Sequence, residues 1–253
     1  MKTDRSCFAA LLMLLLTSPA FAHDTWVEPH TNLVRVGEVL YVDLMLGNHG
    51  NHHRDFKLAG KVDPQHITLE RIGPDGQSTD LKPRLCDLGT ESNPGHWRAQ
   101  VQLQTAGLHM VVCLDDKVVH YAPTRSVKSA KTFFLASERL DEVSAEALNF
   151  DRVLGHPLEL VPRTDPVTPM GPGEPLAVQL LFHGEPLAGT RVSFIPRGVQ
   201  LQGHFDERYE RHTDEQGHAT FTPEQANVYL VVAYHEDPEA SGEGYTSTKY
   251  SAA

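Results

Sequence analysis

Histidine is the residue type with the clearest chemical potential in this chain, which has 15 histidines, all of them after residue 22. His23 stands out because small residues, Ala20 and Ala22, precede it at the positions that a signal peptidase recognises. Cleavage after Ala22 would make His23 the first residue of the mature chain. An N-terminal histidine can offer two nitrogens to one metal ion, its α-amine and its ring Nδ1. The alternative is that a histidine merely happens to follow the cleavage site.

Further nitrogen ligands could come from three histidines in predicted loops, His49, His52 and His120. His49 and His52 belong to a turn rich in glycine and asparagine, where the adjacent His53 would point away from His52 in an extended chain. His120 lies at the end of a predicted strand, a position where ligands often gather. Imidazole nitrogen suits Ni²⁺, Co²⁺ and Cu²⁺, so we expect one of these divalent transition metals. A solvated surface loop without ligands is the alternative.

Residues 1–22 have the features of a secretory signal peptide. Lys2 and Arg5 give a positive start, and the apolar run from Phe8 to Leu16 is too short to span a bilayer. We therefore expect export to the periplasm, with an uncleaved membrane anchor as the alternative. No later stretch approaches transmembrane length, so the mature chain is not expected to cross a membrane.

Two cysteines, Cys86 and Cys113, remain after removal of the signal peptide. A pair of cysteines in an exported chain favours a disulfide bond, because the periplasm is oxidising. We therefore predict a bond between Cys86 and Cys113, with a soft metal site of two thiolates as the alternative.

The balance of charges narrows the choice of partners. The formal net charge is −11 at pH 7. Nucleic acid and anionic membrane surfaces are therefore poor partners, since lysine and arginine supply most of the binding to both. An acidic chain is compatible with cationic partners, metal ions included.

The elements that must position these side chains are predicted to be β-strands. Apolar and polar residues alternate in short runs separated by glycine and proline turns, as in residues 67–72, and residues 96–103 and 107–114 are expected to pair as a hairpin. Four prolines between residues 162 and 173 exclude a central strand or helix there. We predict an all-β protein with two Ig-like β-sandwich domains in tandem. The expected boundaries are listed in chain order: signal peptide 1–22, N-terminal domain 23–162, proline-rich linker 163–173 and C-terminal domain 174–253.

Four stretches carry a resemblance to a known family: His23-Asp24-Thr25-Trp26-Val27-Glu28-Pro29, Gly47-Asn48-His49, Gly155-His156-Pro157-Leu158-Glu159-Leu160-Val161-Pro162 and Thr213-Asp214-Glu215-Gln216-Gly217. Together they resemble a bacterial periplasmic family of unknown function that is often labelled as the substrate-specific component of nickel or cobalt uptake. The resemblance covers essentially the whole mature chain and implies a role in transition-metal handling. Family members usually have glycine directly before the loop histidine, whereas Asn48 intervenes here, so either His49 or His52 is the equivalent residue. The second domain is also similar to carboxypeptidase regulatory-like and transthyretin-like β-sandwiches.

The expected function is that of a metal-binding accessory protein, which takes up an ion and passes it to an inner-membrane metal transporter. We expect no enzymatic activity, because no Gly-x-Ser-x-Gly elbow, His-Glu-x-x-His helix or phosphate-binding glycine loop occurs. A copper-dependent oxidase is one alternative, because an N-terminal histidine can form a histidine brace. A module that binds a protein or a glycan without metal is the other.

Overall fold

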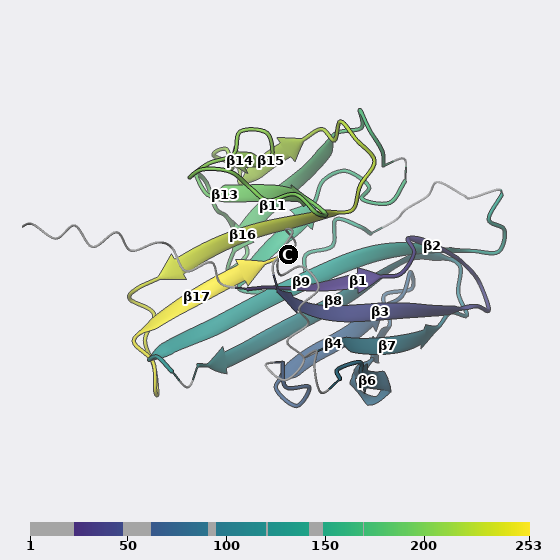
Figure 1. Cartoon of the computed structure of the whole chain (residues 1–253), viewed down its shortest axis with the longest axis horizontal. Helices are drawn as coiled ribbons and strands as arrows, with labels where there is room; N and C mark the ends of the chain where they lie inside the picture. The colour runs from purple at the N-terminus through teal and green to yellow at the C-terminus, as the bar shows by residue number, and fades with distance from the viewer. Residues whose placement is uncertain (1–22, 48–61, 91–94, 120, 142–148, 169) are drawn as a thin grey trace, which may run out of the picture.

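The computed structural model describes residues 23–47, 62–90, 95–119, 121–141, 149–168 and 170–253 (Figure 1). The predicted signal peptide, residues 1–22, lies outside these ranges. Within them the regular structure is β, apart from one short 3₁₀ turn at Lys82–Arg84. The chain is thus all-β, as the alternating sequence pattern predicted. Across the described part of the chain, no helix has both the length and the apolar character needed to span a bilayer.

The strands up to residue 137 are β1 (Asp24–Pro29), β2 (Leu33–Arg35), β3 (Val39–Gly47), β4 (Ile67–Ile72), β5 (Ser78–Asp80), β6 (Leu85–Asp87), β7 (Trp97–Gln102), β8 (Gly107–Val118) and β9 (Thr124–Ser137). The later strands are β10 (Leu158–Pro162), β11 (Leu176–Phe182), β12 (Glu185–Pro186), β13 (Arg191–Pro196), β14 (Glu210–His212), β15 (His218–Phe221), β16 (Tyr229–Asp237) and β17 (Ser247–Ala252).

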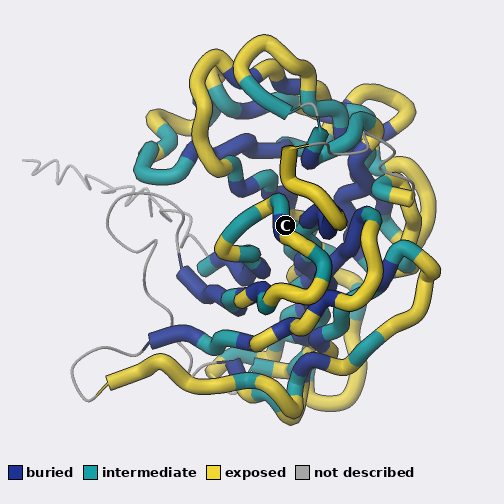
Figure 2. The backbone as a smooth tube through the Cα atoms, turned by 90° about the vertical axis from the view of Figure 1, so that its right-hand side faces the viewer, coloured by how far each residue is buried: buried dark blue, intermediate teal, exposed yellow. Residues whose placement is uncertain are grey.

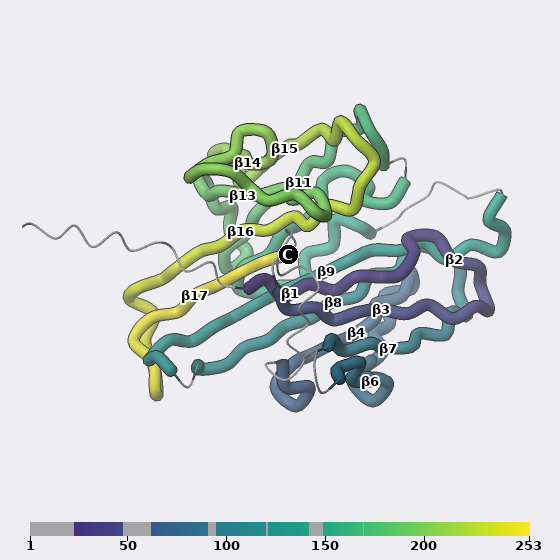
Figure 3. Tube along the Cα trace, in the orientation of Figure 1, coloured from purple at the N-terminus to yellow at the C-terminus, as the bar shows by residue number. Residues whose placement is uncertain are grey.

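These strands form three sheets, of which the largest runs through the whole molecule. The large sheet has nine strands in the order β14-β13-β16-β17-β9-β8-β4-β5, with β2 beside β9. A four-stranded sheet with the order β1-β3-β7-β6 and another built from β10, β11, β12 and β15 complete the fold. The parallel pairing of β17 with β9 joins the two halves of the chain into one sheet (Figure 3).

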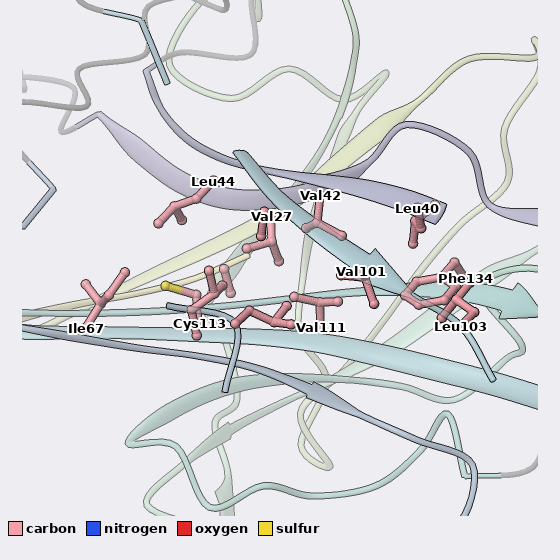
Figure 4. Packing of buried hydrophobic residues seen from close by; sticks show 14 of the residues in the cluster. Val27, Leu40, Val42, Leu44, Ile67, Val101, Leu103, Val111, Cys113 and Phe134 are labelled. Atoms are coloured by element: carbon pink, nitrogen blue, oxygen red, sulfur yellow. The ribbon is translucent and has the colours of Figure 1, made fainter. Parts of the chain in front are cut away.

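The two smaller sheets pack on opposite faces of the large one, because neighbouring residues of a strand point to opposite sides. On β9, Ala130 and Phe134 belong to a core shared with β3 and β7 (Figure 4), whereas Val127 belongs to a second core shared with β10 and β11. In Figure 2, buried residues lie mainly in the interior of the molecule, and exposed residues lie mainly at its turns. The molecule therefore consists of two Ig-like sandwiches that share a central sheet.

The chain does not divide at the predicted boundaries. Strand β10, residues 158–162, was assigned to the N-terminal domain, but it pairs with β11 and contributes Leu158 and Leu160 to the second core. The proline-rich segment after it carries no strand in its described residues, as expected. The continuity of the large sheet depends on contacts between β9 and β17, which are far apart in sequence and leave no local signal.

The expected hairpin of residues 96–103 and 107–114 is also absent. Strand β7 pairs with β3 and β6, whereas β8 pairs with β4 and β9. The two strands therefore lie in different sheets and face each other across the first core, with Val101 on one side and Val111 on the other.

The predicted disulfide bond is not formed, because both cysteines are free thiols. Cys86 is exposed on β6, where its cross-strand partner is Arg98 of β7. Cys113 is fully buried in the first core on β8. The thiol of Cys86 therefore faces solvent on the outer side of the small sheet of β1, β3, β7 and β6. The thiol of Cys113 points from the large sheet toward the inner side of that small sheet. The same separation rules out a site of two thiolates.

Candidate functional site

The structure describes the position of only one of the four predicted metal ligands. His23 is partly buried and comes directly before β1. His49, His52 and His120 lie outside the described residues. Within the described ranges, no group of three or more His, Cys, Asp and Glu side chains is arranged to hold a metal ion. The candidate site is therefore built from the surroundings of His23.

Strand β1 gives His23 a fixed position because its side chains pack against both sandwiches. Its alternate residues point to opposite sides, so that Val27 enters the first core and Trp26 packs against Ile195, Leu230 and Val232 of the second sandwich. Trp26 is only 4% exposed. Arg197 adds an ion pair to Glu28, two residues further along β1. The strand is held from both sides, and its first residues cannot shift independently of either sandwich.

The backbone of His23 is tied directly to the large sheet. Lys128 Nζ on β9 donates a hydrogen bond of 2.6 Å to the His23 carbonyl oxygen. Asp115 on β8 is the cross-strand partner of Lys128, and Lys117 Nζ donates to Asp115 Oδ2 at 2.7 Å. Burial lowers the pKa of Lys128, while the nearby carboxylates of Asp24 and Asp115 offset part of that effect.

Asp24, the first residue of β1, supplies a buried carboxyl group beside His23. It is 6% exposed, and the hydroxyl of Tyr234 on β16 donates a hydrogen bond to its Oδ1. Burial raises the pKa of Asp24 to about 6, although the hydrogen bond from Tyr234 and the charge of Lys128 act in the opposite direction. This carboxyl group therefore titrates close to neutral pH, which is common at functional sites.

The side chains around His23 come from both halves of the chain. Tyr234, Ser251, Lys128 and Asp115 occupy one cross-strand row on the adjacent strands β16, β17, β9 and β8. Such a row points to one face of the sheet, here the face that β1 covers. The start of β1 also lies close to the C-terminus in Figure 3, and Ala253 packs in the same cluster as Trp26. The site thus exists only in the assembled two-sandwich structure.

The histidine-rich loop has a defined starting point relative to this site. Gly47, the last residue of β3, is the cross-strand partner of Asp24. Strand β3 therefore ends beside the residue that follows His23, and His49 and His52 come after it in the chain, outside the described residues. Sequence reasoning did not identify Asp24, Asp115, Lys128 and Tyr234 as neighbours of His23, since their proximity results from pairing between distant strands.

The described residues around His23 form no complete metal site. A mature His23 would offer an amine and an imidazole, which are nitrogen donors of the kind that borderline transition metals prefer. Lys117 and Lys128 lie beside the carboxylates of Asp115 and Asp24 and offset their charge. A nitrogen-rich coordination would need further imidazoles, and the predicted ligands His49, His52 and His120 lie outside the described residues.

A second feature explains the stretch Gly155–Pro162, one of those that carry the family resemblance. The Glu159 carboxylate is 1% exposed and turns back onto its own loop, where it accepts hydrogen bonds from the backbone N–H groups of Leu154, Gly155 and His156. Lys131 Nζ on β9 also donates to Glu159 Oε1 at 2.5 Å. The conformation of the loop is thus fixed by one buried carboxylate, which joins β10 to the large sheet.

A cavity of about 420 Å³ lies elsewhere, between the β4–β5 turn, the start of β8 and residues 149–152. His109 lines it, but both nitrogens of this imidazole are engaged. Nε2 lies 2.9 Å from the Thr105 carbonyl oxygen, and an Arg71 guanidinium nitrogen lies 3.4 Å from Nδ1. His109 is therefore a structural residue and offers no nitrogen to a ligand in this cavity.

The fold and the site define an all-β protein of two Ig-like sandwiches, with a polar site at the start of its first strand. The chain belongs to the family described as domain of unknown function DUF4198, whose model matches residues 20–237. The match includes the described strands from β1 to β16 and ends before β17. No curated protein matches the chain.

Several solved structures show distant similarity. The native conformation of E. coli α-2-macroglobulin is 14% identical, with a TM-score of 0.27 over 86% of this chain and 13% of that chain. A DUF4785 family protein from Legionella pneumophila is 13% identical, with a TM-score of 0.31 over 82% of this chain and 50% of that chain. The D0-D1 domain of intimin is 12% identical, with a TM-score of 0.24 over 91% and 95%. The chain thus spans a small part of the first structure and half of the second.

Proposed function

We propose that this protein is a periplasmic metal-binding accessory protein that carries Ni²⁺, Co²⁺ or Cu²⁺ as cargo during metal uptake or homeostasis. The observation that carries the proposal is the fixed position of His23. Lys128 binds its carbonyl oxygen, and the buried Asp24 and Trp26 anchor the two residues nearest to it on β1. These contacts fix the start of β1, and a fixed start supports a role for the amine and the imidazole of His23.

The ligands in this proposal are the amine and Nδ1 of His23, with one or two imidazoles from His49, His52 and His120. The pairing of Gly47 with Asp24 supports a contribution from the loop that holds His49 and His52. His120 follows the end of β8 at Val118, three residues beyond Asp115. The end of β8 is thus about 10 Å from Asp115 along the strand, and His120 comes still later in the chain, so His120 is the weaker candidate.

The proposed partner is an inner-membrane metal transporter, which would receive the ion. The resemblance to a family labelled for nickel and cobalt uptake supports this role, as does an acidic chain with a net charge of −11, which suits cationic cargo. In this proposal the protein binds and passes on an ion and carries out no enzymatic reaction.

The test begins with N-terminal sequencing of the exported protein, which is expected to give His-Asp-Thr-Trp. Calorimetric titration of the mature protein with Ni²⁺, Co²⁺ and Cu²⁺ should then show binding that His23→Ala weakens by at least tenfold. His66→Ala is the matched control, because His66 is exposed and lies outside the site. Equal binding by the wild type and His23→Ala, or binding by neither, would refute the proposal.

Titrations and activity assays of the same mature protein distinguish the two alternative functions. A module that docks a protein or a glycan without metal would give no heat with any of the three ions. A copper oxidase would consume peroxide when loaded with Cu²⁺ and supplied with a reductant, and His23→Ala would abolish that reaction. A carrier binds the ion without turnover.

A further inference from the structure

Asp115 has an incomplete set of partners in a place where little water can reach it. The residue is 2% exposed, and its Oδ2 accepts the hydrogen bond from Lys117. Its Oδ1 is buried and has no hydrogen-bond partner. A buried carboxylate oxygen without a donor is destabilising, because it has lost its hydrogen bonds to water, so folded proteins rarely leave one in that state.

The position of Asp115 indicates which group could complete it. Asp115 and Lys128 are cross-strand partners on the face of the sheet that β1 covers, and Lys128 holds the carbonyl group of His23. The backbone nitrogen of His23 is separated from that carbonyl carbon only by Cα. In the unprocessed chain this nitrogen belongs to a peptide bond, whereas after cleavage it becomes an ammonium group with three donors.

We infer that Asp115 is the counter-ion of the mature amino terminus, and that signal-peptide removal completes a buried ion pair between the His23 ammonium and Asp115 Oδ1. The pair gives Asp115 Oδ1 a donor that no other nearby group supplies, because Lys117 binds Oδ2, Lys128 binds the His23 carbonyl oxygen and the Tyr234 hydroxyl binds Asp24. Asp115 is then a positioning residue, which holds the amine of His23 over the large sheet. The inference rests on the same start at His23 as the proposed function but involves no metal; an ion that bound through the amine would first displace a proton from this ammonium group.

One consequence concerns the order of events during export. The precursor lacks the ammonium group at His23, so β1 would be held less firmly before cleavage than after it. A chain that is less stable before processing remains easier to unfold for passage across the membrane. Maturation would then strengthen the contact of β1 with both sandwiches at the moment when the site is needed.

The test uses the full mature chain, released from a fusion partner by a protease that leaves no extra residue, with a chelator present throughout. Three amino termini are compared: a start at His23, a start at Ala22 and a start at His23 with an acetylated amine. The extension moves the charge by about 3.5 Å, and acetylation removes it without moving the chain. Both changes should lower the folding equilibrium constant at least tenfold in urea titrations.

Asp115→Asn completes a double-mutant cycle with the changes at the amino terminus. Asp116→Asn is its matched control, since Asp116 is partly exposed and pairs with Arg125 on the other face of the sheet. In Asp115→Asn the three amino termini should have equal stability, whereas in Asp116→Asn the tenfold difference should persist. Equal stability of the three termini in the wild type would overturn the inference, as would an effect of extension without an effect of acetylation. If Asp115→Asn does not fold, the wild-type comparison decides alone. Metal binding measured separately on the same chains tests the proposed function independently.

Discussion

Replacement of Glu159 by glutamine gives the sharpest test of how the two sandwiches are joined. The side chains of Glu159 and Lys131 are 1% and 6% exposed, and their charged groups lie 2.5 Å apart. The same carboxylate accepts hydrogen bonds of 2.9 Å from the backbone nitrogens of Leu154 and Gly155. Glutamine keeps the shape of the side chain but leaves the Lys131 ammonium buried without a counter-charge.

The expected loss is large relative to the stability of a folded protein. Removal of one partner from a buried ion pair costs about 3–5 kcal/mol, because the remaining charge is not compensated. Native proteins are stable by about 5–15 kcal/mol, so Glu159→Gln should lower the urea midpoint markedly. Asp116→Asn is the control, since Asp116 and Arg125 are each 35% exposed. An exposed pair of this kind contributes about 0–1 kcal/mol.

The assay is urea unfolding followed by circular dichroism and tryptophan fluorescence, together with hydrogen exchange of residues 154–156. The amides of Leu154, Gly155 and His156 donate to Glu159, so they should exchange faster in the variant. Acid sensitivity gives a second readout. Burial raises the pKa of Glu159, but the charge and hydrogen bond of Lys131 outweigh it and hold the pKa below its ordinary value.

The sign of that acid sensitivity follows from the lowered pKa. The contribution of Glu159 to stability is fully present above its ordinary pKa and is lost as the pH falls through the lower value of the folded state. Glu159→Gln should lack this part of the acid-induced loss. A loss of less than about 1 kcal/mol at neutral pH, with unchanged exchange at residues 154–156, would refute the view that this carboxylate joins β10 to the large sheet.

Three further outcomes follow from the structure. In the native protein a thiol reagent should modify the exposed Cys86 quickly. It should modify Cys113 only after unfolding, because burial raises the pKa of Cys113 to about 12. A disulfide bond seen by mass spectrometry would contradict this prediction. In a chain that keeps an extension before His23, burial raises the pKa of Asp24 to about 6. The stability that Asp24 contributes should therefore be fully present below pH 3.8 and lost as the pH rises through about 6. Asp24→Asn should remove that dependence in urea titrations at several pH values. Trp26→Ala should cost about 3–5 kcal/mol and expose β1 to limited proteolysis, since Trp26 packs against the second sandwich; an unchanged urea midpoint would show that β1 does not bridge the sandwiches.

The class of fold could be predicted from local patterns, because each strand carries its own signal. The run 67–72 became β4 with the predicted bounds, since its apolar residues alternate and a Gly-Pro-Asp-Gly turn ends it. Pairing was a different matter. Residues 96–103 and 107–114 looked like neighbours because a short turn separates them, yet β7 and β8 face each other across a core. Periodicity records which side of a strand is buried but not which strand lies beside it.

The cysteines show the same limit for the candidate site. Their number and the expected oxidising compartment favoured a bond, but a bond also requires that two Cβ atoms approach within about 4 Å. Cys86 and Cys113 lie on opposite sides of one sheet of the first sandwich, and this depends on the register of β6 on β7 and of β8 on β9. Asp115 and Lys128 were overlooked for a similar reason, because they approach His23 only through the packing of β1 on the large sheet.

Two of the four stretches that carry the resemblance lie where the sandwiches are joined. Residues 23–29 wedge between the sandwiches through Trp26 and Glu28, and residues 155–162 tie β10 to β9 through Glu159 and Lys131. Most of these residues are thus explained by architecture without reference to a ligand. His23 is different, because it belongs to none of the hydrophobic cores, and its backbone carbonyl group is held by Lys128. For that reason the amino terminus, rather than the motifs as a whole, is where the metal-binding proposal is decided.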